Sequence, residues 1–186
     1  MHDAIQRTIQ SLAYSNALTK ALAVFCAAIL VFLLMAAWLV VVFRHRGRVS
    51  VASTLQTVLL FGVSYVAAKA ISHGVSDPRP YIVQHIQPLM PLAHDNGFPS
   101  DHSLLAWAMV FSLLWLAPAA VWPFVLGALL VMLGRLGVGA HHTVDVTGSA
   151  AIVFVVAGLV ALLRWPAGWR RPIFADRRWP IFLRLP

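Results

Sequence analysis

One short segment combines the residue types that nucleophilic and acid–base chemistry require. Arg135 is followed after five residues by His141, and after three more by Asp145. Side chains four residues apart share a helix face, so Asp145 can hydrogen-bond one nitrogen of His141 and leave the other free as nucleophile or base. Three glycines within 134–139 allow the backbone to break there. Such a break would bring the Arg135 guanidinium round to the imidazole.

Two other interpretations of this segment stay open. His141 and Asp145 could be a hydrogen-bonded polar pair at the start of a helix, with no chemical role. His141, His142 and Asp145 could also ligate a metal ion, although no Glu or Cys completes that set. We therefore expect no metal and no cofactor.

A second segment, Phe98-Pro99-Ser100-Asp101-His102, precedes a long apolar stretch. Ser100 or Asp101 could simply be the N-cap of a helix. The free backbone N–H groups of such a helix start, together with the Ser100 hydroxyl, can also bind an anion such as phosphate. His102 beside them could then donate a proton to a leaving oxygen.

Two further cations precede these segments. Arg79 lies in Asp77-Pro78-Arg79-Pro80, which could be no more than a rigid connector, and Lys69 lies about three helical turns earlier. Any one of these charges could be a solvated loop residue. Lys69, Arg79 and Arg135 together would form a clamp for phosphate or diphosphate, because Arg acts as a bidentate fork and Lys as a point charge.

The elements that must position these residues are membrane-spanning helices. Of the 186 residues, 60 % are hydrophobic and 11 % are charged, against about a quarter charged in soluble domains. This composition excludes a water-soluble globule and a disordered chain. Residues 103–134 are uncharged and would be too long for one crossing, at about 48 Å. Pro118 and Pro123 divide them, and five spans result, at 21–43, 49–68, 101–117, 122–139 and 146–163.

The cations predict how these spans are oriented. Nine of the 14 Lys and Arg lie in 44–48 and 164–184, on the same side of a five-span chain. The positive-inside rule makes that side, and the C-terminus, cytoplasmic. The net charge of +8 then reflects membrane topology, and we expect no nucleic-acid partner. The connections 74–101 and 135–145, which carry the candidate site, lie outside.

The two ends of the chain show interfacial patterns. Residues 1–19 place Ile5, Ile9 and Leu12 on one helical face and predict an amphipathic helix along the membrane surface. The basic tail with Trp165, Trp169 and Trp179 is typical of an interfacial anchor. Cys26 is the single cysteine, so no intrachain disulfide is expected. We treat 1–186 as one domain, with the conformation of 81–97 and the oligomeric state open.

In chain order, the segments are Arg79-Pro80, Pro99-Ser100-Asp101-His102 and Arg135-x5-His141-x3-Asp145. They resemble the motifs K-x6-R-P, P-S-G-H and S-R-x5-H-x3-D of the type 2 phosphatidic acid phosphatase (PAP2) superfamily. The resemblance covers about 69–150. Asp101 replaces the usual Gly, as in the BcrC-type undecaprenyl-diphosphate phosphatases of this superfamily, which are similarly small. Gly134 replaces Ser. Nine residues rather than six separate Lys69 from Arg79, so Lys69 would reach the site from about 5 Å deeper.

The resemblance implies an all-α PAP2-type bundle and metal-independent phosphoryl transfer through a phosphohistidine. By it, His141 attacks the terminal phosphorus, Asp145 orients His141, and His102 protonates the leaving lipid phosphate. The phosphoryl oxygens would be held by Lys69, Arg79, Ser100, the backbone at Asp101, and Arg135.

The implied substrate is undecaprenyl diphosphate, a polyprenyl diphosphate lipid, at the outer face of a bacterial plasma membrane. Its hydrolysis would recycle the lipid carrier of cell-wall synthesis. Two alternatives stay open. One is a phosphatase for another lipid phosphate, such as phosphatidylglycerophosphate or phosphatidic acid. The other is a non-catalytic partner in lipid-phosphate transport.

Overall fold

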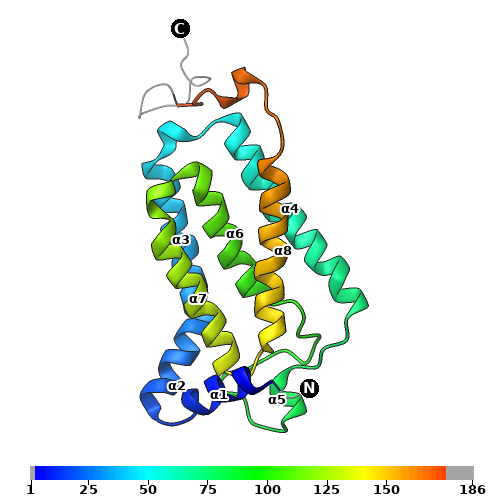
Figure 1. Ribbon diagram of the computed structural model, residues 1–186. Coiled ribbons are helices and arrows are strands. Elements are labelled where there is room, and N and C mark those ends of the chain that lie inside the picture. The colour runs from blue at the N-terminus through cyan, green and yellow to red at the C-terminus, as the bar shows by residue number, and fades with distance from the viewer. Residues whose placement is uncertain (1–2, 175–186) are drawn as a thin grey trace.

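The computed structural model describes residues 3–174, and this part of the chain is helical without a β-strand. The long helical segments run side by side (Figure 1). In chain order the elements are α1 (Ala4–Ala13), α2 (Ala17–Val24), η1 (Phe25–Ile29), α3 (Leu30–Arg44), η2 (Arg46–Arg48), α4 (Val51–Gly74), α5 (Pro80–Val83), α6 (Asp101–Leu116), η3 (Pro118–Ala120), α7 (Val121–Gly137), α8 (Thr143–Ala161) and η4 (Ala167–Arg170).

The helical bundle predicted from composition is confirmed. Within the described residues, four helical segments are long and apolar enough to cross a membrane, namely Ala17–Arg44, Val51–Gly74, Pro118–Gly137 and Thr143–Ala161. Helix α6 is apolar but shorter, with 16 residues. The predicted break near Pro118 is also found, where η3 separates α6 from α7.

Side-chain caps define where several helices begin. The Asn16 side chain accepts a hydrogen bond from the Thr19 backbone N–H at the start of α2. Ser50 does the same for Ser53 at the start of α4, and Ser100 for Ser103 at the start of α6. Each cap provides an acceptor for an N–H group that has no partner inside its helix.

Helix α6 lies at the centre of the bundle (Figure 1). On one side, Met109 and Leu113 pack in a buried cluster with Val31 of α3 and Val131 of α7. On another side, Leu104 packs in a second cluster that includes Leu60 of α4 and residues of α8. The central position fixes the N-terminal end of α6, which carries the second motif, relative to all the other spans.

The outer surface of the bundle is apolar. Large hydrophobic side chains such as Leu39, Val58, Leu126 and Phe154 are 58–65 % exposed along α3, α4, α7 and α8. Exposed apolar surface of this extent is expected where a helix faces lipid rather than water. The surface therefore agrees with the long apolar helices in indicating a membrane protein.

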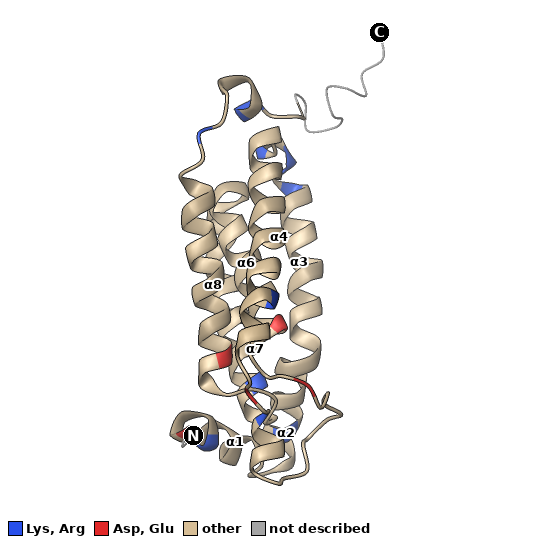
Figure 2. Cartoon of the chain, turned by 90° about the vertical axis from the view of Figure 1, so that its right-hand side faces the viewer, with Lys and Arg blue, Asp and Glu red and all other residues tan. Residues whose placement is uncertain are grey.

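Basic residues gather at one end of the bundle, and the remaining charged residues lie in the half toward the other end (Figure 2). At one end, the chain after α8 returns to the connection between α3 and α4, where the Ile173 N–H donates to the Val49 carbonyl at 2.8 Å. The basic segments 44–48 and 164–171 therefore share one end, as predicted. Arg177, Arg178, Trp179 and Arg184, which belong to the same prediction, lie outside the described residues.

The predicted N-terminal helix is present as α1, and its polar face packs against the protein. Gln6 and Gln10 are buried, and the Gln6 amide donates to the Leu136 carbonyl at the end of α7 at 3.4 Å. Ile5 and Leu12 stay exposed. The apolar face is thus available for the membrane surface, where the sequence pattern places it.

Candidate active site

His141 lies in the short connection between α7 and α8, and a left-handed glycine brings it there. Helix α7 ends at Gly137, and Gly139 adopts a φ of +76°, a conformation that side chains with a Cβ disfavour. The Ala140 N–H then turns back to donate to the Arg135 carbonyl at 3.1 Å. The predicted break in the backbone is therefore confirmed, and it places Arg135 beside His141.

A backbone carbonyl fixes the tautomer of His141. The Nδ1 atom lies 2.8 Å from the carbonyl oxygen of Gly97 and 3.4 Å from Oδ2 of Asp145. A carbonyl oxygen can only accept, so Nδ1 carries the hydrogen and Nε2 keeps its lone pair. The predicted contact with Asp145 exists, but the carbonyl of Gly97 is the nearer acceptor.

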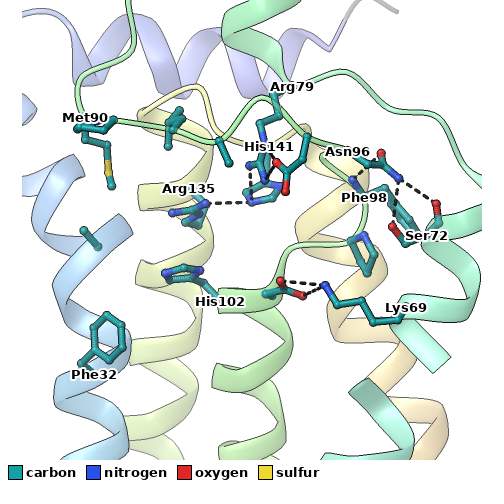
Figure 3. Close-up of a pocket in the computed structure, with 17 residues that line it drawn as sticks. Phe32, Lys69, Ser72, Arg79, Met90, Asn96, Phe98, His102, Arg135 and His141 are labelled. Carbon is teal, nitrogen blue, oxygen red and sulfur yellow. Dashed lines mark hydrogen bonds and ion pairs between the residues drawn. The ribbon is translucent and has the colours of Figure 1, made fainter. Parts of the chain in front are cut away.

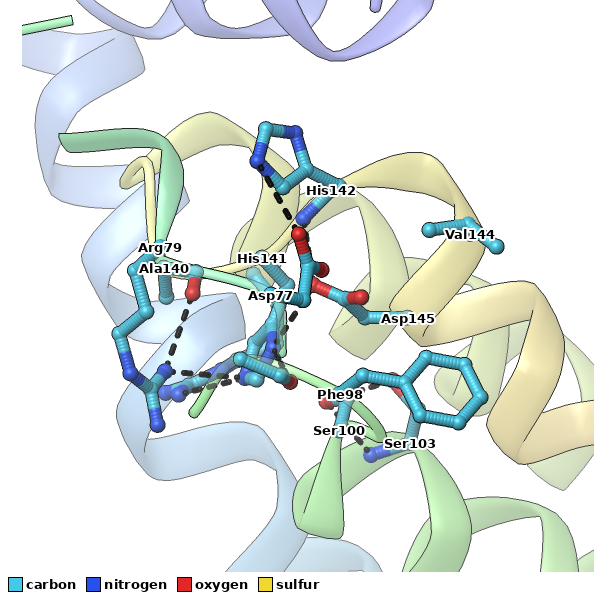
Figure 4. A network of polar contacts seen from close by, with 12 residues as sticks. Asp77, Arg79, Phe98, Ser100, Ser103, Ala140, His141, His142, Val144 and Asp145 are labelled. Carbon is cyan, nitrogen blue, oxygen red and sulfur yellow. Dashed lines mark hydrogen bonds and ion pairs between the residues drawn. The ribbon is translucent and has the colours of Figure 1, made fainter. Parts of the chain in front are cut away.

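The free nitrogen of His141 faces two arginines (Figure 4). Arg135 Nη2 lies 3.2 Å and Arg79 Nη1 lies 3.4 Å from Nε2. Burial, together with the positive charges of Arg135 and Arg79, lowers the pKa of His141 well below its usual value. The imidazole is consequently neutral at neutral pH, with its lone pair aimed where both guanidinium groups would meet an anion.

Arg79 is held in this orientation by Asp95. Its Nε and Nη2 atoms both donate to Oδ1 of Asp95, at 2.9 and 2.7 Å, while Nη1 donates to the Ala140 carbonyl at 3.0 Å. Burial would raise the pKa of Asp95, but the hydrogen bonds and charge of Arg79 outweigh it and lower that pKa. The ionised Asp95 leaves one edge of the guanidinium directed at His141.

Arg135 is anchored on the opposite side by the first span. Its Nη1 atom donates to the Ala27 carbonyl of the π-helical turn η1 at 3.3 Å. A Cβ atom at Gly134 would lie 2.5 Å from the Ala27 backbone nitrogen. Gly134, which departs from the family motif, therefore permits the close helix contact that brings this carbonyl to Arg135.

The start of α6 forms another wall of the site. His102, in the first turn, projects into the same cavity as Arg135 and lies edge-on to Phe32, with ring centroids 6.4 Å apart (Figure 3). Ser100 is fully buried, and its hydroxyl caps α6. The Ser100 side chain therefore lies behind the wall of the cavity rather than in its lining.

Lys69 reaches the site by pairing with Asp101. Its Nζ atom lies 3.1 Å from both carboxylate oxygens of Asp101, and both side chains are substantially exposed. Two of the three residues that depart from the family pattern, Lys69 and Asp101, thus contact each other. Asp101 holds the Lys69 ammonium at the edge of the site despite its altered spacing.

These groups line one cavity of about 520 Å³ (Figure 3). Of the predicted site residues, those in its lining are Lys69, Arg79, Asp101, His102, Arg135 and His141. Asp145 is completely buried behind His141. The sequence therefore predicted correctly that three cations and two imidazoles converge at one end of the bundle.

A comparison with known protein families agrees with this geometry. Residues 53–169 match the model of the PAP2 superfamily. The chain belongs to the PAP2 superfamily. The match spans α4 to η4 and so contains every side chain of the cavity that we predicted from the motifs. This chain is therefore an enzyme of the PAP2 phosphatase family.

Two curated proteins resemble this PAP2 enzyme. Undecaprenyl-diphosphatase BcrC of Bacillus subtilis (strain 168) is 29 % identical over 167 residues, covering 86 % of this chain and 82 % of the relative. The bacitracin transport permease protein BcrC of Bacillus licheniformis is 25 % identical over 115 residues, or 61 % of this chain and 57 % of the relative. No solved structure matches significantly.

Sequence reasoning missed two residues that organise the site. Gly97 offers the carbonyl that accepts from His141, and Asp95 orients Arg79. Both lie in the 81–97 connection, for which the sequence predicts no conformation. The turn-forming run Asp95-Asn96-Gly97, directly before the second motif, was the available signal. The Asn96 amide donates to the Val75 carbonyl at 2.6 Å and ties this turn to the end of α4.

His142 points away from the cavity, and its Nε2 atom lies 3.3 Å from the Pro78 carbonyl. Within residues 3–174, no three His, Cys or Asp side chains are grouped as a metal ion would require. The structure therefore gives no support to the alternative of a metal site made of His141, His142 and Asp145.

Proposed function

We propose that this PAP2 enzyme hydrolyses undecaprenyl diphosphate to undecaprenyl phosphate and inorganic phosphate through a phosphohistidine at His141. The single observation that carries the proposal is the His141 imidazole, whose Nδ1–H is anchored at 2.8 Å while Nε2 faces two arginines. The similarity to the undecaprenyl-diphosphatase of Bacillus subtilis supports the choice of lipid.

In the first step, the Nε2 lone pair of His141 forms a bond to the terminal phosphorus. The bond between that phosphorus and the bridging oxygen breaks, and protonated His102 gives its proton to the departing lipid phosphate. Arg79 and Arg135 hold the equatorial oxygens, where the transition state concentrates negative charge. Lys69 and the free N–H groups at the start of α6 add to this binding.

In the second step, neutral His102 takes a proton from water, and the water oxygen attacks the phosphorus. The bond from phosphorus to Nε2 breaks, inorganic phosphate leaves, and the lone pair returns to His141. The Nδ1 hydrogen stays on the imidazole throughout, held by Gly97. The N-phosphorylated ring is positively charged, and the buried Asp145 carboxylate 3.4 Å from Nδ1 stabilises that charge.

We place the site at the outer face of a bacterial plasma membrane, because the basic segments lie at the other end of the bundle. A transport role, which the name of the Bacillus licheniformis relative suggests, would need cations for binding. It would not need an imidazole with a fixed tautomer. The His141 environment favours turnover.

The test is phosphate release by the purified protein in detergent, with a metal chelator present. We expect release from a C55 polyprenyl diphosphate, faster than from phosphatidylglycerophosphate or phosphatidic acid, and none from His141→Ala. A faster reaction with a glycerophospholipid would change the substrate while keeping the chemistry. Binding of the lipid without phosphate release would support the transport role instead.

A further inference from the structure

Asp77 lies behind the catalytic imidazole, although the sequence motifs give it no role. Its backbone is held on both sides: its carbonyl accepts from the Gly97 N–H at 2.7 Å, and its N–H donates to Oδ1 of Asn96 at 3.0 Å. This fixed backbone directs the Asp77 side chain at the start of α8, where its carboxyl group meets that of Asp145 (Figure 4).

Two buried carboxyl oxygens at this contact have no hydrogen-bond partner within residues 3–174, namely Oδ2 of Asp77 and Oδ1 of Asp145. The two carboxyl groups lie against each other, so the bond that both lack is one between them (Figure 4). Because a carboxylate can only accept, this bond requires a proton on one of the two groups. Two ionised carboxylates in contact would repel each other strongly in this buried place.

The surroundings decide which group holds the proton. Oδ2 of Asp145 accepts from the His142 backbone N–H at 2.7 Å and lies 3.4 Å from Nδ1 of His141, so both neighbours favour its ionised form. The side chain of Asp77 has only the His142 ring, with Nε2 3.8 Å from Oδ1. The proton therefore belongs to Asp77.

We propose that Asp77 is protonated in the working enzyme and donates a hydrogen bond to the Asp145 carboxylate, as a positioning residue for His141. The pair then carries one negative charge rather than two, and the proton stays on Asp77 through the catalytic cycle. Asp77 is absent from the cavity lining, so it acts through Asp145 and not on the substrate. This inference rests on the proposed role of His141 as nucleophile.

Ionisation of Asp77 gives this arrangement a pH limit. Burial, followed by the hydrogen bond and the charge of Asp145, raises the pKa of Asp77 to about 7. The charge of Asp3 acts in the same direction, and that of His142 acts against it. Above this pH the second negative charge would push Asp145 away from His141. We therefore expect the loss of an Asp77 proton to contribute to the alkaline limb of the kcat profile.

Two variants of similar volume test whether Asp77 acts through its hydrogen-bond donor or only through the shape of its side chain. Asp77→Asn keeps a donor that cannot ionise, so kcat should stay close to that of the wild type and the alkaline limb should move up by about one pH unit or more. Asp77→Leu removes the donor and should lower kcat about tenfold to a hundredfold, as loss of an outer-shell partner does. Asp101→Asn removes a carboxylate elsewhere in the site and should leave the alkaline limb in place.

Infrared spectroscopy of the full-length protein detects the proton without relying on activity. The wild type at pH 6 should show the carbonyl band of a protonated carboxylic acid, and Asp77→Asn should lack it. Persistence of the band in Asp77→Asn, or an alkaline limb that neither Asp77 variant moves, would overturn the proposal. A wild type that shows the band but releases no phosphate would support the protonated carboxyl pair and refute the proposed function.

Discussion

His141 lies between Arg79 and Arg135, which affect both its contacts and its pKa. Both guanidinium groups face Nε2, and both hold the pKa of His141 down after burial has lowered it. The charges that we propose to bind a phosphoryl group therefore also keep the proposed nucleophile unprotonated. The same logic explains why the nearest partner of Nδ1 is a neutral carbonyl, which orients the ring without raising its basicity as much as a carboxylate would.

Replacing His141 tests the nucleophile directly. His141→Ala should lower kcat by about a thousandfold or more, because no other side chain of the cavity offers a lone pair beside both arginines. The variant should keep the thermal unfolding temperature of the wild type within a few degrees in detergent. Near-normal phosphate release by a folded His141→Ala protein would contradict the assignment.

The charge of Arg135 should be visible in the pH profile. A depressed His141 pKa means that the neutral, reactive ring persists below pH 6.5 and is lost only at lower pH. Arg135→Gln removes one of the groups that depress this pKa. The acid limb of kcat/KM should then move to higher pH, in addition to a loss of about a hundredfold in kcat.

Lys69→Gln is the matched control for that experiment. It removes a cation from the same cavity, but Lys69 pairs with Asp101 and is not among the main groups that lower the pKa of His141. We expect weaker substrate binding and an unmoved acid limb. Equal movement in both variants would show that the limb reports the overall charge of the cavity instead.

The side chains that form the site could be predicted from the sequence, whereas the backbone groups that contact them could not. The spacing of Arg135, His141 and Asp145 indicated one site because side-chain types and helix periodicity carry that information. The Gly97 carbonyl has no signature, since every residue has a carbonyl group. Likewise, the pair of Arg79 and Asp95 forms within an irregular connection, where no periodicity relates two positions.

At the scale of elements, Gly134 sets how closely the first span packs on α7. Because a Cβ here would lie 2.5 Å from the Ala27 nitrogen and 2.7 Å from the Cys26 carbonyl carbon, the helices must separate to accept one. Gly134→Ala should therefore lower the free energy of unfolding by about 1–3 kcal/mol, as overpacking does. It should also lower kcat, since the Ala27 carbonyl would leave Arg135.

Gly158 provides the control, because a Cβ there would meet nothing within 4 Å. Gly158→Ala in α8 should leave activity unchanged and should stabilise the protein slightly, since Ala is the better helix former by about 1 kcal/mol. Thermal unfolding in detergent measures both variants. Equal stability of the two would show that the close contact at Gly134 has no energetic consequence.

Helix α1 holds the start of α8 through Asp3. The Asp3 carboxylate accepts from the Thr143 N–H at 2.6 Å and from the Thr143 hydroxyl at 2.9 Å, two residues after His141. Asp3→Ala should cost about 1 kcal/mol of stability, as loss of a helix cap does, and should lower kcat. Thr8→Ala changes an exposed residue of the same helix, whose hydroxyl donates only to the Ala4 carbonyl, and should change neither.

The effect of Asp3 should depend on pH. Burial raises its pKa, but the hydrogen bonds from Gln6 and Thr143 outweigh burial and lower it below 3.8. A depressed carboxyl pKa means that the stabilisation is present above the unfolded value and is lost as the pH falls through the folded value. The stability difference between wild type and Asp3→Ala should therefore be constant near neutrality and shrink below pH 4.

The whole molecule separates its charges between two ends. The basic segments between α3 and α4 and after α8 share one end, where the Ile173 N–H donates to the Val49 carbonyl (Figure 2). The residues that line the cavity lie toward the other end. The positive-inside rule predicts that the first end is cytoplasmic, and the proposed substrate would then present its diphosphate from outside. Under the same proposal, the apolar sides of the bundle would leave the lipid chain in the bilayer.

Cysteine labelling of intact cells tests this orientation. In a Cys26→Ala background, Met90→Cys lies in the cavity lining and should react with a membrane-impermeant maleimide added outside. Gly47→Cys, between the basic residues that follow α3, should react only after the membrane is permeabilised. The reverse pattern would turn the site toward the cytoplasm. The enzyme would then act on a lipid diphosphate of the inner leaflet, and a role in recycling a carrier released outside would require a separate flipping step.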